Sequence, residues 1–219
     1  MTSSDFPVSD RSRLRRQPGR GSHDREQIYA ILDEGLVCHV SVVVEGRPVV
    51  IPMAYGRDGD RLLLHGAIAS RLMKTLAEGA EVCVGVTLVD GLVLARSTFH
   101  SSLNYRSVVA FGRARRIQGD EARRAALDAL VEHIVPGRSQ EARAPSEAEL
   151  KATEVVELLI EEATAKVRSG PPKEPAGDCT LPVWAGVLPL SLAVGTPEAA
   201  PDLAAGLRPS EVIVRWRRP

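Results

Sequence analysis

Residues 48–74 read PVVIPMAYGRDGDRLLLHGAIASRLMK, and this stretch decides how the chain can fold. Two apolar runs flank a polar turn that holds Gly56 and Gly59. Glycines accept the positive φ angles of tight turns at little steric cost, so the pattern predicts a β-hairpin. Ser70 then stands where it can cap a short helix over residues 71–78. The stretch therefore predicts strand, turn, strand and helix in close succession.

The same short spacing of strands and turns continues on both sides of this stretch. Strands are expected at residues 36–44, 49–55, 61–65, 82–88, 92–95 and 107–117, with a hairpin turn at Asp90-Gly91. Helices are expected at residues 24–34 and 120–135. Residues 150–168 fit a helix or a strand, with a strand favoured at 153–161, and a short strand is expected at 211–216. The pattern predicts a mainly β fold with flanking helices, built as an antiparallel six-stranded split barrel.

Composition narrows the class of protein. The 219 residues are 44% hydrophobic and balance 28 basic against 28 acidic side chains, so no nucleic acid or membrane partner is expected. Residues 1–22 are rich in arginine and are expected to form a flexible arm. Residues 23–219 are expected to form a single domain that ends in a C-terminal extension. Cys38, Cys83 and Cys179 are widely spaced, which predicts reduced thiols and a cytoplasmic protein.

The first candidate site is the cluster of Ser70, Arg71 and Lys74 at the start of the predicted helix. A hydroxyl, a guanidinium and an ammonium group at a helix N-terminus suit a phosphate. The alternative is an ordinary exposed basic helix face.

A second candidate is the polar stretch at residues 98–106, which holds His100 and Tyr105 between two apolar strands. It is either a set of donors to a polar ring or phosphate, or a solvated loop. Trp184 lies in a proline-flanked apolar segment, where it would line a planar cofactor or pack in the core or an interface. The five histidines show no metal-binding spacing. The sequence has no G-x-S-x-G motif of a serine hydrolase and no Walker A or G-x-G-x-x-G motif for binding nucleotide phosphates.

Together these segments resemble the FMN-binding split β-barrels of the pyridoxamine 5′-phosphate oxidase-like family, in the flavin-nucleotide-binding or nitroimidazole-resistance-like branch. The resemblance covers residues 20–190. It is carried by LLLHGA at 62–67 with Ser70-Arg71, VDGLVLARS at 89–97, FHSSLNYRSVV at 99–109, KVRSGPP at 166–172 and PVWAGV at 182–187.

The resemblance implies a homodimer with two FMN sites at the subunit interface and a small organic molecule as substrate. It implies that the cofactor is bound by the residues His65, Ser70, Arg71, Lys74, Arg106, Ser107 and Trp184. The activity implied is that of a flavin-dependent oxidoreductase, with His100 and Tyr105 as candidate proton donors.

The sequence departs from the pyridoxamine-phosphate oxidases at two positions. Ile51 and Gly56 stand where those enzymes carry an arginine and a lysine, so cofactor binding transfers better than the vitamin B6 substrate. Two alternatives stay open. One is a flavin carrier without turnover; the other is a barrel that uses deazaflavin or haem, with His65 or His100 as candidate haem ligands.

Overall fold

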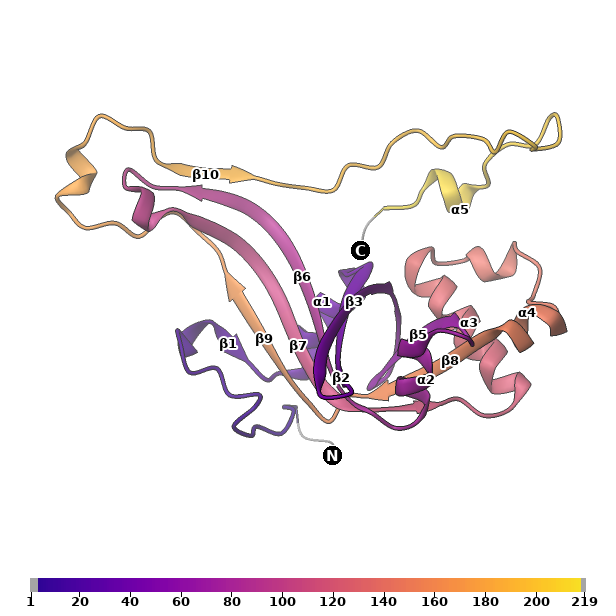
Figure 1. The fold of residues 1–219 in the computed structure, drawn as a ribbon. Helices are drawn as coiled ribbons and strands as arrows, with labels where there is room; N and C mark the ends of the chain where they lie inside the picture. Colours follow the sequence, from indigo (N-terminus) through magenta and orange to yellow (C-terminus); the bar gives the residue numbers. More distant parts are fainter. Residues whose placement is uncertain (1–3, 218–219) are drawn as a thin grey trace. The chain divides into compact units, whose positions relative to one another are not determined.

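The computed structural model describes residues 4–217, and its strands pair antiparallel, which confirms the predicted mainly β class. The chain divides into two compact units. Unit 1 comprises residues 1–35, 84–110 and 162–192, and unit 2 comprises residues 36–83, 111–161 and 193–219. The long strands β6 (Glu81–Leu94) and β7 (Ser102–Arg116) contribute residues to both units (Figure 1).

Unit 1 contains an antiparallel sheet built around residues 84–94 of β6 and 102–110 of β7. Its other elements are η1 (Pro18–Arg20), β1 (Gly21–Ser22), α1 (Arg25–Glu34), η2 (Thr98–His100), β9 (Glu162–Arg168), η4 (Asp178–Thr180) and β10 (Gly186–Pro189). β10 pairs with β6, and β9 pairs with β1 and β7 (Figure 1).

Unit 2 holds the remaining strands and helices. They are β2 (Val37–Val44), β3 (Arg47–Ala54), β4 (Gly56–Asp58), β5 (Arg61–Ala67), α2 (Arg71–Ala77), α3 (Asp120–Ile134), η3 (Arg138–Gln140), α4 (Glu147–Ala152), β8 (Thr153–Leu159) and α5 (Glu211–Val214). β5 pairs with β8 over its whole length, and Leu63, Leu130 and Val155 are buried where α3 packs on these strands.

The β2–β3 hairpin turns at Glu45 and Gly46. Glu45 and Gly46 both take positive φ angles, 52° and 75°, which matches the twist that a two-residue hairpin turn requires. Ser146 and Glu149 form the capping box of α4, and the ambiguous segment that follows is the strand β8, as favoured from its apolar run.

Three expectations from local sequence were wrong. Asp90-Gly91 is not a turn, because β6 continues through it; Gly91 pairs with Pro189 of β10, and a Cβ there would lie 3.0 Å from the Leu188 carbonyl oxygen. β7 begins at Ser102, inside the polar stretch at residues 98–106 and ahead of the strand expected at 107–117. The C-terminal segment expected as a strand forms the helical turn α5, with Trp216 Nε1 donating to the Ile134 carbonyl.

The N-terminal segment, predicted as a flexible arm, makes defined contacts with unit 1 over its described residues; residues 1–3 lie outside them. Phe6 is buried, and its backbone N–H donates to the His23 carbonyl at 2.9 Å. The Glu162 carboxylate accepts hydrogen bonds from Ser9 and Ser12 and pairs with Arg11. These bonds attach the segment to β9.

Cys38, Cys83 and Cys179 are free in the described part of the chain, and their reduced state stays a prediction. Burial raises the pKa of the Cys38 thiol to about 12. Among the residues described, no helix is long and apolar enough to cross a membrane.

We expect Glu162→Gln to lower the free energy of unfolding by about 1 kcal/mol or more at pH 7, because it removes charge-assisted hydrogen bonds to the N-terminal segment. These bonds lower the Glu162 pKa from 4.5 to about 2. The folded pKa lies below the unfolded one, so this stabilisation is present above pH 4.5 and is lost as the pH falls toward 2. Urea unfolding of both proteins should therefore give curves that converge in acid; a constant difference would contradict this role.

We expect Gly112→Ala to destabilise the fold by about 3 kcal/mol or more, because a Cβ at Gly112 would lie 1.9 Å from the Leu159 carbonyl oxygen. Gly85→Ala is the matched control, since a Cβ at Gly85 meets nothing within 4 Å. Thermal unfolding of the two variants should separate them clearly; equal melting temperatures would show that the two backbones can move apart.

Candidate functional site

The β5–α2 corner, defined here as residues 65–74, brings together four of the predicted cofactor-binding residues. The Ser70 hydroxyl caps α2 by accepting the Met73 N–H at 3.5 Å, as the sequence predicted. Gly66 is required here, because a Cβ at that position would lie 2.9 Å from Met73 Cγ. The end of β5 is therefore closely packed against the first turn of α2.

Arg71 and Lys74 are exposed at this corner, and their side chains make no ion pair or hydrogen bond within the described part of the chain. Both charges are thus available to an anion. Figure 1 shows α2 directly after β5, so the Ser70 hydroxyl and these two cations belong to one short segment. Ser70, Arg71 and Lys74 therefore lie together at the start of α2, as predicted. The binding of a phosphate there stays a prediction.

His65 borders an apolar cavity of about 460 Å³ within unit 2. The walls come from α3, through Leu127, Leu130, Val131 and Ile134, and the rim includes Arg143 and Glu149. His65 stays accessible to solvent, yet the protein around it removes enough water to lower the imidazole pKa below its ordinary value. The neutral imidazole has a lone pair that a metal can accept. The cavity thus combines apolar walls with one potential metal ligand.

Arg106 and Ser107 have partners within unit 1. The Arg106 guanidinium binds Asp90, with Nε at 3.0 Å and Nη2 at 2.8 Å from its carboxylate oxygens, and also binds Glu34. The two carboxylates raise the Arg106 pKa. The Ser107 hydroxyl donates to the Lys166 carbonyl at 3.3 Å. These contacts join α1, β6, β7 and β9, so both side chains already have partners within the protein. Their contact with a flavin stays a prediction.

The remaining predicted site residues also belong to unit 1. Trp184 is 67% exposed and its ring covers Gly186, where a Cβ would lie 2.9 Å from the indole. Tyr105 is half-buried on β7. His100 lines a pocket of about 460 Å³ with Ser101 and Ser102. A role for His100 or Tyr105 as a proton donor stays a prediction.

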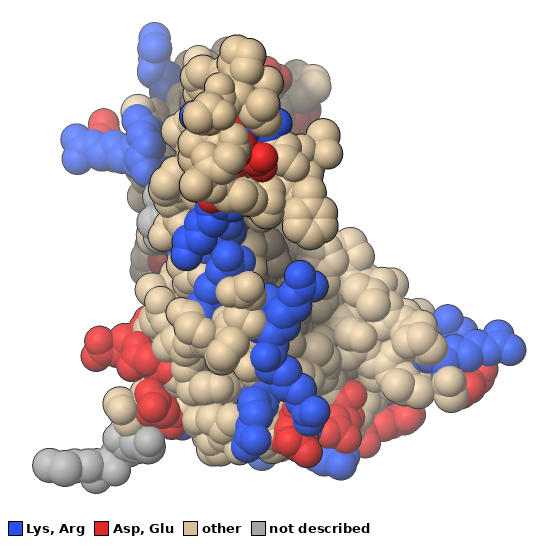
Figure 2. Space-filling view, turned by 90° about the vertical axis from the view of Figure 1, so that its left-hand side faces the viewer, with Lys and Arg blue, Asp and Glu red and all other residues tan. Residues whose placement is uncertain are grey.

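The sequence reasoning missed the charge of that pocket. Its basic side chains come from two segments distant in the chain, and they are Arg16, Arg20, Lys166, Arg168 and Lys173. Figure 2 faces the side on which η2 and β1 are drawn in Figure 1, and shows Lys and Arg side chains gathered there. The arginines of residues 1–22 and the KVRSGPP motif were visible in the sequence, but nothing local indicated that they meet. We call this the basic pocket.

Two solved structures resemble this chain over nearly its whole length. The flavocytochrome Anf3 from Azotobacter vinelandii is 39% identical, with a TM-score of 0.87, over 95% of this chain and 97% of that one. The FAD and haem binding protein from Mycobacterium smegmatis is 40% identical, with a TM-score of 0.85, over 89% of this chain and 96% of that one.

A structure from Bacteroides thetaiotaomicron, provisionally assigned to 5-nitroimidazole antibiotic resistance, is 25% identical with a TM-score of 0.57. It matches 67% of this chain and 86% of that one. The sequence has no match among curated proteins.

The family model for pyridoxamine 5′-phosphate oxidase matches residues 24–167. The match spans most of the chain and agrees with the predicted split-barrel fold. This chain is therefore a member of the pyridoxamine 5′-phosphate oxidase family.

Proposed function

We propose that this protein is a flavin-binding redox protein that also binds haem. The observation that carries the proposal is the near-complete match, at 39% and 40% identity, to a flavocytochrome and to a protein described as binding FAD and haem. Two features of this chain support it independently: the free cations of the β5–α2 corner and the apolar cavity beside His65.

The flavin phosphate would be held at the β5–α2 corner. Arg71 offers a planar fork of donors and Lys74 a compact charge three residues later, on the same side of α2. FMN, the cofactor predicted from the sequence, and FAD, named for the Mycobacterium protein, both carry a phosphate next to the ribityl chain. The near-complete match to that protein favours FAD. The bound flavin would supply the one- and two-electron chemistry.

The apolar cavity of unit 2 fits haem in three respects. Haem needs apolar walls, an axial ligand, and a cation or solvent for its propionates. The aliphatic side chains of α3 provide the first, and neutral His65 provides the second. Arg143 lies at the rim, where it already pairs with Glu149 at 2.6 Å. Of the two haem-ligand candidates from the sequence, His65 is therefore preferred to His100, whose pocket is basic and polar.

A homodimer is part of the proposal. Val43 and Val50 lie on one face of the β2–β3 hairpin and are 64% and 56% exposed, and Trp184 is 67% exposed. Apolar side chains grouped on a strand pair are typical of a surface that a partner covers. A second copy would cover it, with the flavin at the subunit interface and Trp184 as one wall. Catalysis on a small organic substrate is the activity we expect of such a dimer.

We expect Arg71→Ala to weaken flavin binding by about 1.5–3 kcal/mol, the loss typical of a hydrogen bond to a charged group. Lys151→Ala is the control, because Lys151 is an exposed lysine of the same unit without an ion pair among the described residues. Flavin fluorescence titration measures both. Unchanged affinity in the Arg71 variant would exclude this corner as the phosphate site.

We expect His65→Ala to remove the Soret absorption band of the haem-loaded protein while the flavin spectrum persists. His100→Ala is the matched variant and should keep the band, because His100 lies in the other unit and lines the basic pocket. Loss of the band only in the His100 variant would reverse the assignment. A protein that neither purifies with haem nor binds added haem would refute the haem part of the proposal.

A further inference from the structure

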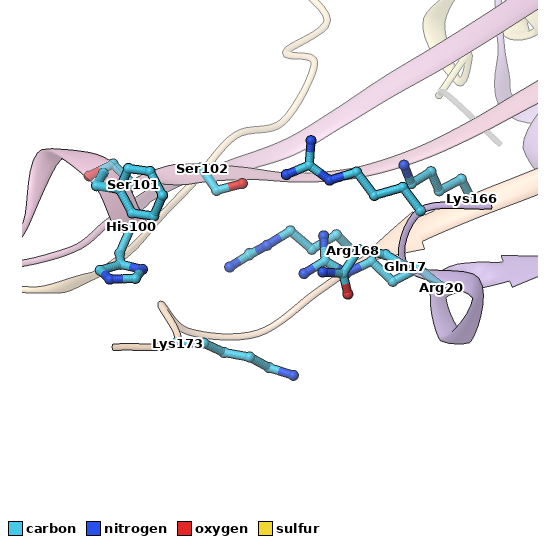
Figure 3. Close-up of a pocket in the computed structure, with 10 residues that line it drawn as sticks. Gln17, Arg20, His100, Ser101, Ser102, Lys166, Arg168 and Lys173 are labelled. Carbon is cyan, nitrogen blue, oxygen red and sulfur yellow. The ribbon is translucent and has the colours of Figure 1, made fainter. Parts of the chain in front are cut away.

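The basic pocket lies wholly within unit 1 and has a cavity of about 460 Å³. Figure 3 shows Arg20, Lys166 and Arg168 on one side, His100, Ser101 and Ser102 on the other, and Lys173 along a third. Arg20 comes from η1, Arg168 from β9 and Lys173 from the loop that follows β9. A volume of this size is typical of small-molecule sites.

The positive charges of this pocket are not neutralised by the protein. Among the residues described, no aspartate or glutamate lines it. Arg16, Arg20, Lys166 and Lys173 make no side-chain hydrogen bond or ion pair within the described part of the chain. Like charges held this close repel one another, so the arrangement costs stability unless an anion binds.

Arg168 gives this pocket a built floor. Its residue is only 7% exposed, and its guanidinium donates to neutral oxygens: the Asn104 side chain and the carbonyls of Gly170 and Pro171, the last two at 3.3 Å. Burial, followed by the charge of Arg20, lowers the Arg168 pKa. A buried arginine usually has a carboxylate partner. The neutral partners here orient the guanidinium and leave its charge for a ligand.

The rim of the pocket adds a surface for a planar ring. Phe99 lines the pocket and is 86% exposed, and its ring meets His100 edge to face at 5.1 Å between centroids. Exposed aromatic rings beside cations are the usual combination for binding a base and its phosphates. Ser101 and Ser102 also line the pocket. The Ser101 hydroxyl already donates to the Ser97 carbonyl, whereas the Ser102 hydroxyl can donate to a sugar or phosphate.

We propose that the basic pocket binds the nucleoside diphosphate moiety of a dinucleotide, with the diphosphate on Arg20, Arg168 and Lys173 and the base on Phe99. Five basic side chains exceed what one phosphate requires and match a diphosphate. The binding itself is independent of the proposed function, which bears only on the source of the moiety. The source is a nicotinamide dinucleotide that donates electrons, or FAD; if it is FAD, both of its phosphates lie in this pocket and not at the β5–α2 corner.

The test compares wild-type protein with the double variant Arg20→Gln/Lys173→Gln and with Arg13→Gln. Arg13 is an exposed arginine of the same N-terminal segment that does not line the pocket, so its replacement removes a positive charge outside the pocket. Arg168→Gln is avoided as the main variant because Arg168 is buried and donates to the loop carbonyls of Gly170 and Pro171, so its loss would disturb the loop. Thermal unfolding confirms that each variant is folded.

Calorimetric titrations with ADP, FAD and FMN give the result. If a nicotinamide dinucleotide is the source, ADP binds the wild type, and the double variant loses about tenfold or more in ADP affinity with FAD unchanged. If FAD is the source, the double variant loses about tenfold or more in FAD affinity with FMN unchanged. Either result supports the pocket. A double variant that matches wild type and Arg13→Gln for all three ligands overturns it.

A further variant separates the base from the phosphates. Phe99→Ala should weaken ADP or FAD binding about tenfold and leave inorganic pyrophosphate unaffected, since base stacking on an aromatic ring contributes about 1–3 kcal/mol. Equal effects on both probes would exclude the ring contact. A colourless protein that takes up no flavin but binds ADP in this charge-dependent way would refute the proposed function and keep the pocket.

Discussion

The paired strands β6 and β7 are the feature on which the rest of this structure depends, because each contributes residues to both units. In unit 1, β6 pairs with β10 and β7 pairs with β9. In unit 2, the end of β7 pairs with β8. Arg106 lies on this pair and binds carboxylates from α1 and β6. An arginine that satisfies two carboxylates at once orients three elements, since removing it would leave both acids uncompensated.

The two candidate anion sites differ in how the chain constructs them. The β5–α2 corner is formed by one continuous segment of the chain. A strand, a glycine and a capping serine precede Arg71 and Lys74 by only a few residues. The basic pocket is assembled from distant segments and depends on the N-terminal segment being attached through Glu162 to β9. A protein that handles a flavin and an electron donor needs more than one anion site, and these two have free cations suited to that task.

The departures from the vitamin B6 enzymes agree with this picture. Ile51 pairs with the buried Val40 of β2, and a Cβ at Gly56 would lie 2.9 Å from the Leu130 backbone. Neither position can supply the charges that a pyridoxamine-phosphate oxidase would use there. The chain instead carries an apolar cavity beside His65, and the two relatives that match nearly its whole length are described as a flavocytochrome and as an FAD and haem binding protein.

The sequence by itself determined the elements whose cause is local. β-branched residues identified β2, capping identified α2, and apolar periodicity identified α3. Tertiary structure decided what depends on distant partners. Asp90-Gly91 is strand because β10 pairs beside it and Arg106 binds Asp90. The polar start of β7 is also strand, and its local sequence did not indicate this either. The basic pocket could not be read from any window of sequence, because its charges come together only when the N-terminal segment, η2 and β9 pack in one unit.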